Sequence, residues 1–532
     1  MRRLHATMGS VLGLMVVTAW GEDPRAQPAA GGITRVTTLV ISTPELFLSR
    51  DPLVGGTTTA SEINAQIYES PIAFKFAPVD VKGGKALVQQ GDEIEAKLAE
   101  KVEVSPDGRV YTFRLRKGVR FYPSGNEMTA KDWLYMFERA LSSPAGFGKF
   151  FAGNVGFSSP GRVVDPYTFE LTINNPNPQF HYMAVINSAI IDSAAARQNA
   201  PADDAWSTKW LDKNTAGTGP YYLKSTSQQE IVLEENPSYW GRKPFFKRLV
   251  YRHVPNVSDR VLLLRSGETD VAYRLPQKEL NDLARAPGVK VLSAPSNTID
   301  VMFMNVTKGP TADQNVRKAI LAAIPYDDII SNVFFGRARK YDGLFMDEGL
   351  GYVKGPAPVQ DLNRAKALLA QSQHPGGFTV EMLVRADSAQ NEQEALLIKD
   401  ALGKVGVTAN IVKLAAGDYS AKARTYPLVL RTNHPWLDEG IHIAISYILP
   451  TSFFNYSELK IPEMPELLKQ AYTTDTAARK ATYEKMQQLW FAQDPVAILA
   501  RFDQAWAMRD SVADFTFHEP LMPLWWRATR AK

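Results

Sequence analysis

Cysteine is absent from the 532-residue chain. Its absence excludes disulfide bonds, thiolate metal sites and cysteine nucleophiles. We also expect no lipid tether, because the acylated residue that anchors many exported proteins is a cysteine. Histidine is scarce as well: the chain has seven histidines, and none forms the i, i+4 pair of a helical zinc site. Chemistry that depends on thiols or on paired histidines is therefore not expected.

The chain also lacks an excess of charge of one sign. Its 60 basic and 56 acidic residues give a formal net charge of +4, and they are interspersed without a basic block. A basic stripe or patch is the usual electrostatic signature of nucleic-acid binding. We therefore expect no nucleic-acid partner.

Long hydrophobic runs are missing except near the start of the chain. Residues 8–20 are apolar, follow Arg2 and Arg3, and lead into small residues. This order predicts a cleaved signal peptide at 1–21 and a linker at 22–32, because the run falls short of the roughly 20 residues that span a bilayer. An uncleaved anchor is the alternative. Together with the missing cysteine, the pattern predicts a soluble periplasmic protein without a lipid anchor.

Motifs of catalysis are weak. The segment GFSSPG, residues 156–161, lacks the nucleophile-elbow pattern of serine hydrolases and predicts a loop. The segment GTGPYYL, residues 217–223, lacks the third glycine of a phosphate-binding loop, so we assign its glycines to a tight turn before a strand. By elimination we expect a binding protein rather than an enzyme, with no cofactor and no metal.

Hydrophobic periodicity predicts alternating strands and helices. Residues 378–384, 408–414 and 426–432 have strand patterns, and residues 392–406 carry apolar side chains at helical spacing. Strand–helix–strand order predicts a parallel or mixed sheet in an α/β fold. Ligands of such sheets sit beyond the carboxyl ends of the strands, and the segment HPWLDEG begins at the end of the third of these strands.

This segment and the residue before it hold four candidate ligand-binding residues: Asn433, His434, Trp436 and Asp438. The Asp438 carboxylate is suited to a ligand cation, with Trp436 as a cation–π partner. Two other interpretations stay open. Asp438 caps a local turn beside a core tryptophan, or His434 and His442 hold a metal.

Six segments resemble, in order, the extracellular solute-binding proteins of family 5, the oligopeptide, dipeptide and nickel class. The most specific is residues 98–133, with a Ser-Pro-Asp-Gly turn, a Phe-x-Leu-Arg strand and a Thr-Ala-x-Asp helix start. The other five segments are residues 50–70, 217–223, 235–244, 264–273 and 316–324.

The resemblance implies an α/β fold of the periplasmic-binding-protein type, class II, with mixed sheets. Two lobes enclose a hinged cleft, and an extra domain is inserted in one of them. Carried over to this chain, the topology predicts a first lobe at 33–74, 188–297 and 496–532, an inserted domain at 75–187, and a second lobe at 298–495.

The resemblance also implies roles for individual residues. In peptide-binding members, an aspartate near a tryptophan of the second lobe holds the peptide's α-ammonium group, and Asp438 matches that position. The spacing here is Trp436-x-Asp438, one residue shorter than in the family. Thr57 and Thr58 fall in a ligand-side loop, and Phe150 falls at an aromatic rim. The alternatives are a plain surface loop and domain packing.

For function, the resemblance implies a solute-binding component of an ABC importer. Such a monomer captures a peptide or other small nitrogenous solute between its lobes and delivers it to an inner-membrane permease and ATPase complex. A metal-chelate or nickel-type binding protein is the alternative within the family. A periplasmic chaperone or sensor partner is the alternative outside it, because a fold does not fix a function.

Overall fold

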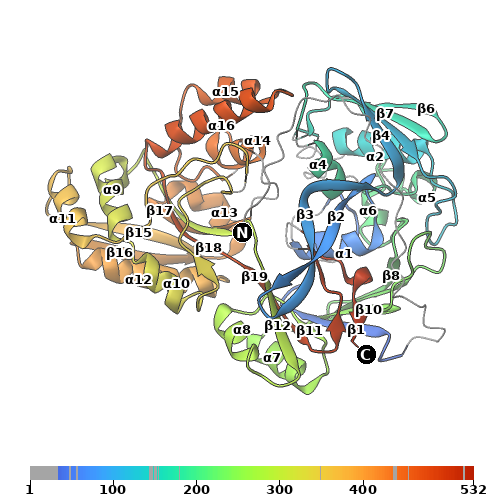
Figure 1. Ribbon diagram of the computed structural model, residues 1–532, viewed down its shortest axis with the longest axis horizontal. Helices are drawn as coiled ribbons and strands as arrows, with labels where there is room; N and C mark the ends of the chain where they lie inside the picture. Colours follow the sequence, from blue (N-terminus) through green and yellow to red (C-terminus); the bar gives the residue numbers. More distant parts are fainter. Residues whose placement is uncertain are drawn as a thin grey trace.

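The computed structural model describes residues 34–531, except 47–48, 55–57, 143–147, 149–151, 154, 179, 188, 348, 435–439, 453 and 519–521. Two large sheets with their helices form two lobes that lie side by side in Figure 1. Within the described part of the chain, no helix is long and apolar enough to cross a membrane.

The first lobe is built on a seven-stranded sheet in which β1 runs parallel to both of its neighbours, β10 and β11. The helices of this lobe are α1 (Thr58–Ile67), α5 (Ser193–Gln198), α6 (Thr208–Leu211), α7 (Val257–Ser266) and α8 (Gln277–Leu283). In sheet order the strands are β12 (Val289–Ala294), β19 (Gln504–Arg509), β11 (Val271–Ala272), β1 (Thr38–Thr43), β10 (Arg248–His253), β9 (Glu230–Glu235) and β8 (Tyr221–Thr226).

The second lobe is built on a six-stranded sheet in which β15 runs parallel to β16 and β17. The parallel or mixed sheet predicted from the sequence is therefore confirmed. In sheet order the strands are β14 (Ala338–Arg339), β18 (Val496–Phe502), β13 (Ile299–Met304), β17 (Leu428–Asn433), β15 (Phe378–Arg385) and β16 (Val407–Leu414).

Two hydrophobic cores cover the two faces of this second sheet, because alternate residues of each strand point to opposite sides. One core packs against α9 (Gln314–Ala323), α10 (Tyr326–Asn332), α11 (Leu362–Ala370) and α12 (Ala389–Gly403). The other packs against α13 (Ala416–Lys422), α14 (Gly440–Ile443), α15 (Met464–Ala471) and α16 (Thr476–Phe491).

A smaller unit carries the family-like motif of residues 98–133. Its sheet has the order β4 (Ala99–Val104), β5 (Val110–Leu115), β7 (Thr168–Thr172) and β6 (Arg162–Asp165), beside α2 (Ala130–Ser142) and α4 (Phe180–Asn187). Phe113, Leu115 and Phe121 are buried in its core. A further sheet consists of β2 (Ile72–Val81), β3 (Gly84–Ala96), β21 (Thr516–His518) and β22 (Met522–Pro523). A two-stranded ribbon of β20 (Val512–Ala513) and β23 (Thr529–Arg530) completes the strands.

The glycines of GTGPYYL lie just before β8, where the chain bends at residues 219 and 220. A Cβ atom on Gly217 or Gly219 would lie 2.2 or 2.4 Å from the carbonyl oxygen of Ile67, at the end of α1. These residues are therefore small because the helix end approaches them closely. Neither has a positive φ, so a left-handed turn conformation is not the reason.

The chain crosses between the two lobes twice. One crossing is residues 295–298, between β12 and β13, and the other is Asp503, between β18 and β19. We predicted that the chain returns to the first lobe at residue 496. This boundary is wrong for β18, which pairs with β13 and is buried along its whole length in the second sheet. The return therefore comes at Asp503.

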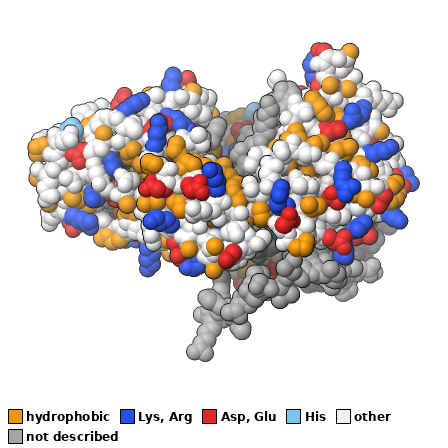
Figure 2. All heavy atoms as spheres, turned by 90° about the horizontal axis from the view of Figure 1, so that it is seen from above, with side chains coloured by type: hydrophobic (Ala, Val, Ile, Leu, Met, Phe, Trp, Pro, Cys, Tyr) orange, Lys and Arg blue, Asp and Glu red, His pale blue; other side chains and the backbone are white. Residues whose placement is uncertain are grey.

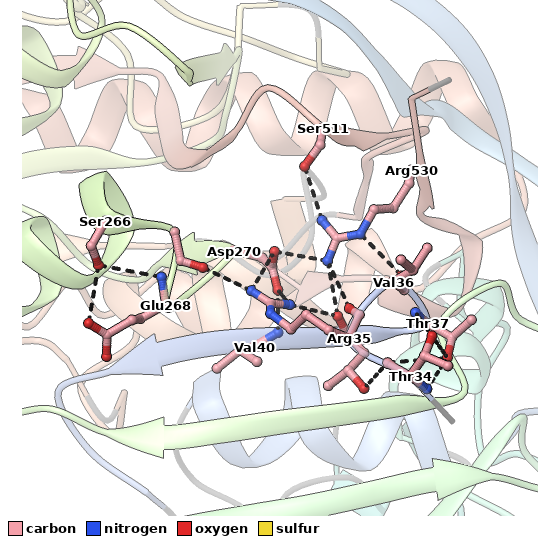
Figure 3. Close-up of polar contacts among 12 residues, drawn as sticks. Thr34, Arg35, Val36, Thr37, Val40, Ser266, Glu268, Asp270, Ser511 and Arg530 are labelled. Atoms are coloured by element: carbon pink, nitrogen blue, oxygen red, sulfur yellow. Dashed lines mark hydrogen bonds and ion pairs between the residues drawn. The ribbon is translucent and has the colours of Figure 1, made fainter. Parts of the chain in front are cut away.

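The Asp270 carboxylate fastens three segments of the first lobe together (Figure 3). It accepts hydrogen bonds from Arg35 at 2.6 Å, from the backbone N–H of Val40 at 2.8 Å, and from Arg530 at 3.0 Å. The start of β1 is thereby held against the C-terminal strand β23. The network therefore fixes the start of β1, a central strand of the first sheet.

Candidate ligand-binding site

Parallel strands from both lobes end at the region between them. In the second lobe, the neighbours β15 and β17 end at Arg385 and Asn433. In the first lobe, the neighbours β1 and β11 end shortly before Glu45 and Arg274. Ligands of α/β sheets bind beyond such carboxyl ends. We call the residues Glu45, Arg274, Arg385, Asp387, Asn433 and His434 the interlobe site.

Arg385 and Asp387 form a two-pronged ion pair just beyond β15. The Nε–Oδ1 distance is 2.6 Å and the Nη2–Oδ2 distance is 2.7 Å. Hydrogen bonding from Arg385 lowers the pKa of Asp387, and the charge of Arg274 in the first lobe lowers this pKa further. The Asp387 carboxylate therefore lies within the electrostatic reach of the opposite lobe.

A second ion pair, between Arg274 and Glu45, belongs to the first lobe. The pKa of Arg385 is raised chiefly by Asp387, and Glu45 also raises it. Each pair thus has its acid near the base of the other pair. The arrangement presents two cations and two anions to the space between the lobes, a pattern suited to a ligand that carries both signs of charge.

His434 follows β17 and contacts the crossing between the lobes. Its Nδ1 atom lies 2.8 Å from Thr298 Oγ1. Burial lowers the pKa of His434 to about 3, and the charges of Arg431 and Arg274 lower it as well. The imidazole is therefore neutral near neutral pH. The described residues contain no group of three or more potential metal ligands of the His, Cys, Asp or Glu types.

Asn433 and Arg431 belong to the end of β17 and lie just before His434 in the chain. Asn433 is buried, and its Oδ1 accepts a hydrogen bond of 2.8 Å from Arg431 Nε. The Arg431 guanidinium lies 3.7 Å from the ring centroid of Phe454, and its Nη1 lies 3.3 Å from the hydroxyl of Tyr456. The positive charge of Arg431 acts on the site, because it lowers the pKa of His434.

The described residues test only part of the predicted site. Trp436, Asp438, Thr57 and Phe150 lie outside them, and their ligand contacts stay predictions. Thr58 is the first residue of α1, and its contact with ligand also stays a prediction. Asn433 and His434 lie at the predicted strand end, and their contacts with a ligand stay predictions.

Four charged residues of the interlobe site were missed from the sequence: Glu45, Arg274, Arg385 and Asp387. The signal for two of them was present, because Arg385 and Asp387 follow the strand predicted at 378–384. The strand-end rule that singled out Asp438 applies to them equally. Glu45 and Arg274 could be found only once β1 and β11 were known to be parallel neighbours.

Charges of both signs are mixed over the face of the molecule drawn in Figure 2. On the face shown in Figure 2, lysine and arginine side chains alternate with acidic ones over both lobes. This mixture agrees with the small net charge of the sequence.

Two lobes, two crossings and strand ends facing each other define a solute-binding protein of the periplasmic-binding-protein type. The chain belongs to the bacterial extracellular solute-binding proteins, family 5, whose model matches residues 93–447. The resemblance seen in the sequence is thereby confirmed.

Known relatives cover most of the chain. The probable D,D-dipeptide-binding periplasmic protein DdpA of Escherichia coli K12 is 27% identical over 443 residues, which are 81% of this chain and 83% of the relative. The dipeptide-binding protein of the same organism is 27% identical over 489 residues, 86% of each chain. The periplasmic binding protein DppA of Helicobacter pylori, solved with the peptide STSA, is 25% identical, with a TM-score of 0.78 over 93% of this chain and 98% of that one.

Proposed function

We propose that this protein is the solute-binding component of an ABC importer and captures a peptide or other small nitrogenous solute between its lobes. The observation that carries the proposal is the presence of one ion pair in each lobe at facing strand ends. These are Arg385–Asp387 in the second lobe and Arg274–Glu45 in the first. Two of the relatives named above are described as dipeptide-binding and probable D,D-dipeptide-binding proteins, and a third was solved with a peptide.

The charges of the site fit a zwitterionic ligand. Arginine guanidinium groups bind a carboxylate through two parallel hydrogen bonds, which is the role we assign to Arg385 and Arg274. Carboxylates balance a ligand ammonium, which is the role we assign to Asp438, with Trp436 contributing a cation–π face. Asn433 and His434 lie at the strand end, and we assign ligand contacts to them, to Thr57 and Thr58, and to Phe150.

The proposed setting is the periplasm, where the relatives DdpA and DppA are placed by their descriptions. In this setting residues 1–21 act as a cleaved signal peptide, and the mature chain is a monomer without a lipid anchor. Its partners are then an inner-membrane permease and its ATPase. Binding, without turnover of the ligand, is the activity that we assign.

The experiment is a ligand screen on protein that has been unfolded and refolded to remove bound solute. Melting temperatures are measured with a set of dipeptides and tripeptides, and hits are titrated by calorimetry. We expect one site per chain with a dissociation constant of about micromolar or tighter, about −8 kcal/mol. The matched controls are the same peptides with an acetylated amino end or an amidated carboxyl end. If no peptide shifts the melting temperature, and mass spectrometry finds no small solute on the native protein, the proposal fails.

A further inference from the structure

A cavity of about 380 Å³ lies where the chain crosses between the lobes. Its lining includes Ser296 and Asp503 from the two crossings. It also includes three arginines: Arg337 directly before β14, Arg339 in β14 and Arg501 in β18. In the second sheet, β14 pairs with β18, whereas β17 pairs with β13. The strands β18 and β13 therefore separate this hinge cavity from the interlobe site.

Arg337 brings a positive charge to the hinge cavity, and no carboxylate among the described residues forms a hydrogen bond with it. Its side chain is buried, and its Nη1 and Nη2 atoms donate to the backbone carbonyls of Gln277 and Leu280 in α8, at 3.3 Å each. Its Nε atom has no hydrogen-bond partner among the described residues. A buried guanidinium that has no bonded carboxylate carries a large desolvation cost. An anion in the cavity would therefore stabilise the buried charge of Arg337.

Two more arginines line the hinge cavity. Arg339 donates to Asp347 at 2.9 and 3.0 Å, and Arg501 also pairs with Asp347. Arg501 Nε donates to the backbone carbonyl of Ser296 at 3.0 Å, which fixes this arginine to the first crossing. The cavity thus brings together three arginines whose positions are set by backbone and carboxylate contacts.

Asp503 supplies the one carboxylate of the described lining. No residue in the described ranges forms a hydrogen bond or an ion pair with its side chain. Burial raises the pKa of Asp503, although the charges of Lys82, Arg501, Arg339 and Arg337 all act to lower it. Its backbone N–H donates to the carbonyl of Arg337 at 3.0 Å, so both residues belong to one local structure. Asp503 offers an acceptor that is still unused.

We propose that the hinge cavity binds inorganic hydrogen phosphate. Guanidinium groups are the preferred donors to phosphate oxygens, and three arginines line this cavity. Hydrogen phosphate also keeps one P–OH group near neutral pH, and this group donates to the Asp503 carboxylate. Sulfate has no proton at this pH, so one of its oxygens would face the Asp503 carboxylate without a hydrogen. Three arginines, two of them paired with Asp347, and the Asp503 carboxylate therefore favour a protonated oxyanion.

A phosphomonoester would be rejected for the same reason. Its last acidic proton is lost above a pKa of about 6, and its dianion then has no donor for Asp503. Inorganic phosphate retains its donor at about pH 8, whereas a monoester of the same charge does not. Inorganic phosphate, sulfate and a phosphomonoester have similar shapes, but only inorganic phosphate carries a proton at about pH 8. Comparing their affinities therefore distinguishes recognition of the proton from attraction of negative charge.

The test uses the full chain at about pH 8 and constant ionic strength, with inorganic phosphate, sulfate and methyl phosphate as separate probes. Melting temperature and calorimetric titration are measured for each anion. Ligand binding to the folded state stabilises it in proportion to affinity, so we expect a rise in melting temperature with phosphate and one phosphate per chain. We expect sulfate and methyl phosphate to bind at least about tenfold more weakly.

Two variants assign the selectivity to residues. Asp503→Asn should bring the affinities for phosphate and sulfate to within about threefold of each other, and Arg337→Lys should weaken both. The matched control is Arg364→Gln, an exposed arginine on α11, which should leave both affinities unchanged. Equal effects of the three anions on the wild-type protein would overturn the proposal, as would unchanged selectivity in Asp503→Asn. If that variant does not fold, the comparison of anions on the wild-type protein decides alone.

Discussion

Thr298 joins His434 to the crossing between the lobes. Its Oγ1 atom lies 2.8 Å from His434 Nδ1 and accepts a hydrogen bond of 2.9 Å from Nε2 of Gln504, the first residue of β19. His434 directly follows β17, where the segment with Asp438 begins. A displacement of His434 would therefore be transmitted to both crossings through the Thr298 hydroxyl group, which contacts His434 and Gln504. This contact is the physical link that we propose between solute binding and lobe movement.

Asp438→Asn should weaken binding of a cationic or zwitterionic ligand. If the carboxylate pairs with a ligand ammonium away from water, its loss costs about 2–5 kcal/mol, or about thirtyfold to several thousandfold in dissociation constant. Calorimetric titration of the variant and the wild-type protein with the same peptide measures this change. A turn-capping role would instead lower the melting temperature and leave the affinity within about twofold.

Arg385→Gln should weaken binding of ligands that carry a carboxylate. The substitution removes a guanidinium at the end of β15 and leaves Asp387 without its partner at 2.6 Å. Loss of a bidentate, charge-assisted contact should raise the dissociation constant at least about tenfold. An amidated peptide should lose less, because it lacks the group that Arg385 binds. Equal losses for the acid and the amide would contradict the role that we assign to Arg385.

Arg139→Met should strongly destabilise the folded chain. Arg139 on α2 and Asp51 are both fully buried, and Arg139 Nη2 lies 2.6 Å from Asp51 Oδ2. Removing one partner of a buried pair costs about 3–5 kcal/mol, because the other charge stays buried. Chemical denaturation measures the loss. The matched control is Arg162→Met, which breaks a more exposed pair with Glu170 and should cost less than about 1 kcal/mol.

Glu394→Gln should flatten the dependence of stability on pH. Glu394 and Asp300 are fully buried neighbours, and burial raises the pKa of both carboxyl groups. The folded state therefore keeps a proton that the unfolded state releases as pH rises above about 4.5, the ordinary pKa of a glutamate. Stability supplied by the protonated pair is present at low pH and declines as pH rises, by up to about 1.4 kcal/mol per pH unit for each proton.

Urea denaturation from about pH 5 to 8 tests this prediction. The free energy of unfolding of Glu394→Gln should decline less steeply with pH than that of the wild-type protein. Glu381→Gln, an exposed position on β15, provides the matched control and should keep the wild-type slope. A wild-type slope in Glu394→Gln would show that the pair does not hold the extra proton.

Much of the second lobe was predictable from the sequence, because its strands are buried and its helices amphipathic. The strands predicted at 378–384 and 408–414 match β15 and β16 to within one residue at each end. The predicted helix at 392–406 is displaced from α12 by about one turn. Ser388 caps α12 through its side chain, and this local signal was overlooked in favour of Gly406.

The lobe boundary and two residues of the interlobe site required the structure. β18 reads as a hydrophobic strand in the sequence, but nothing local says which of the two sheets it joins. Glu45 and Arg274 are far apart in the sequence and become neighbours only because β1 and β11 pair in parallel. Their relation to Arg385 and Asp387 depends on how the lobes face each other, which local patterns do not encode.

Closure of the lobes around a solute is the central claim, and small-angle scattering tests it most directly. The radius of gyration is measured for ligand-free protein and for protein saturated with the peptide chosen by the screen. We predict a smaller radius with ligand, since rotation about residues 295–298 and Asp503 brings Glu45 and Arg274 toward Arg385 and Asp387. An unchanged radius at saturating peptide would contradict closure about these crossings.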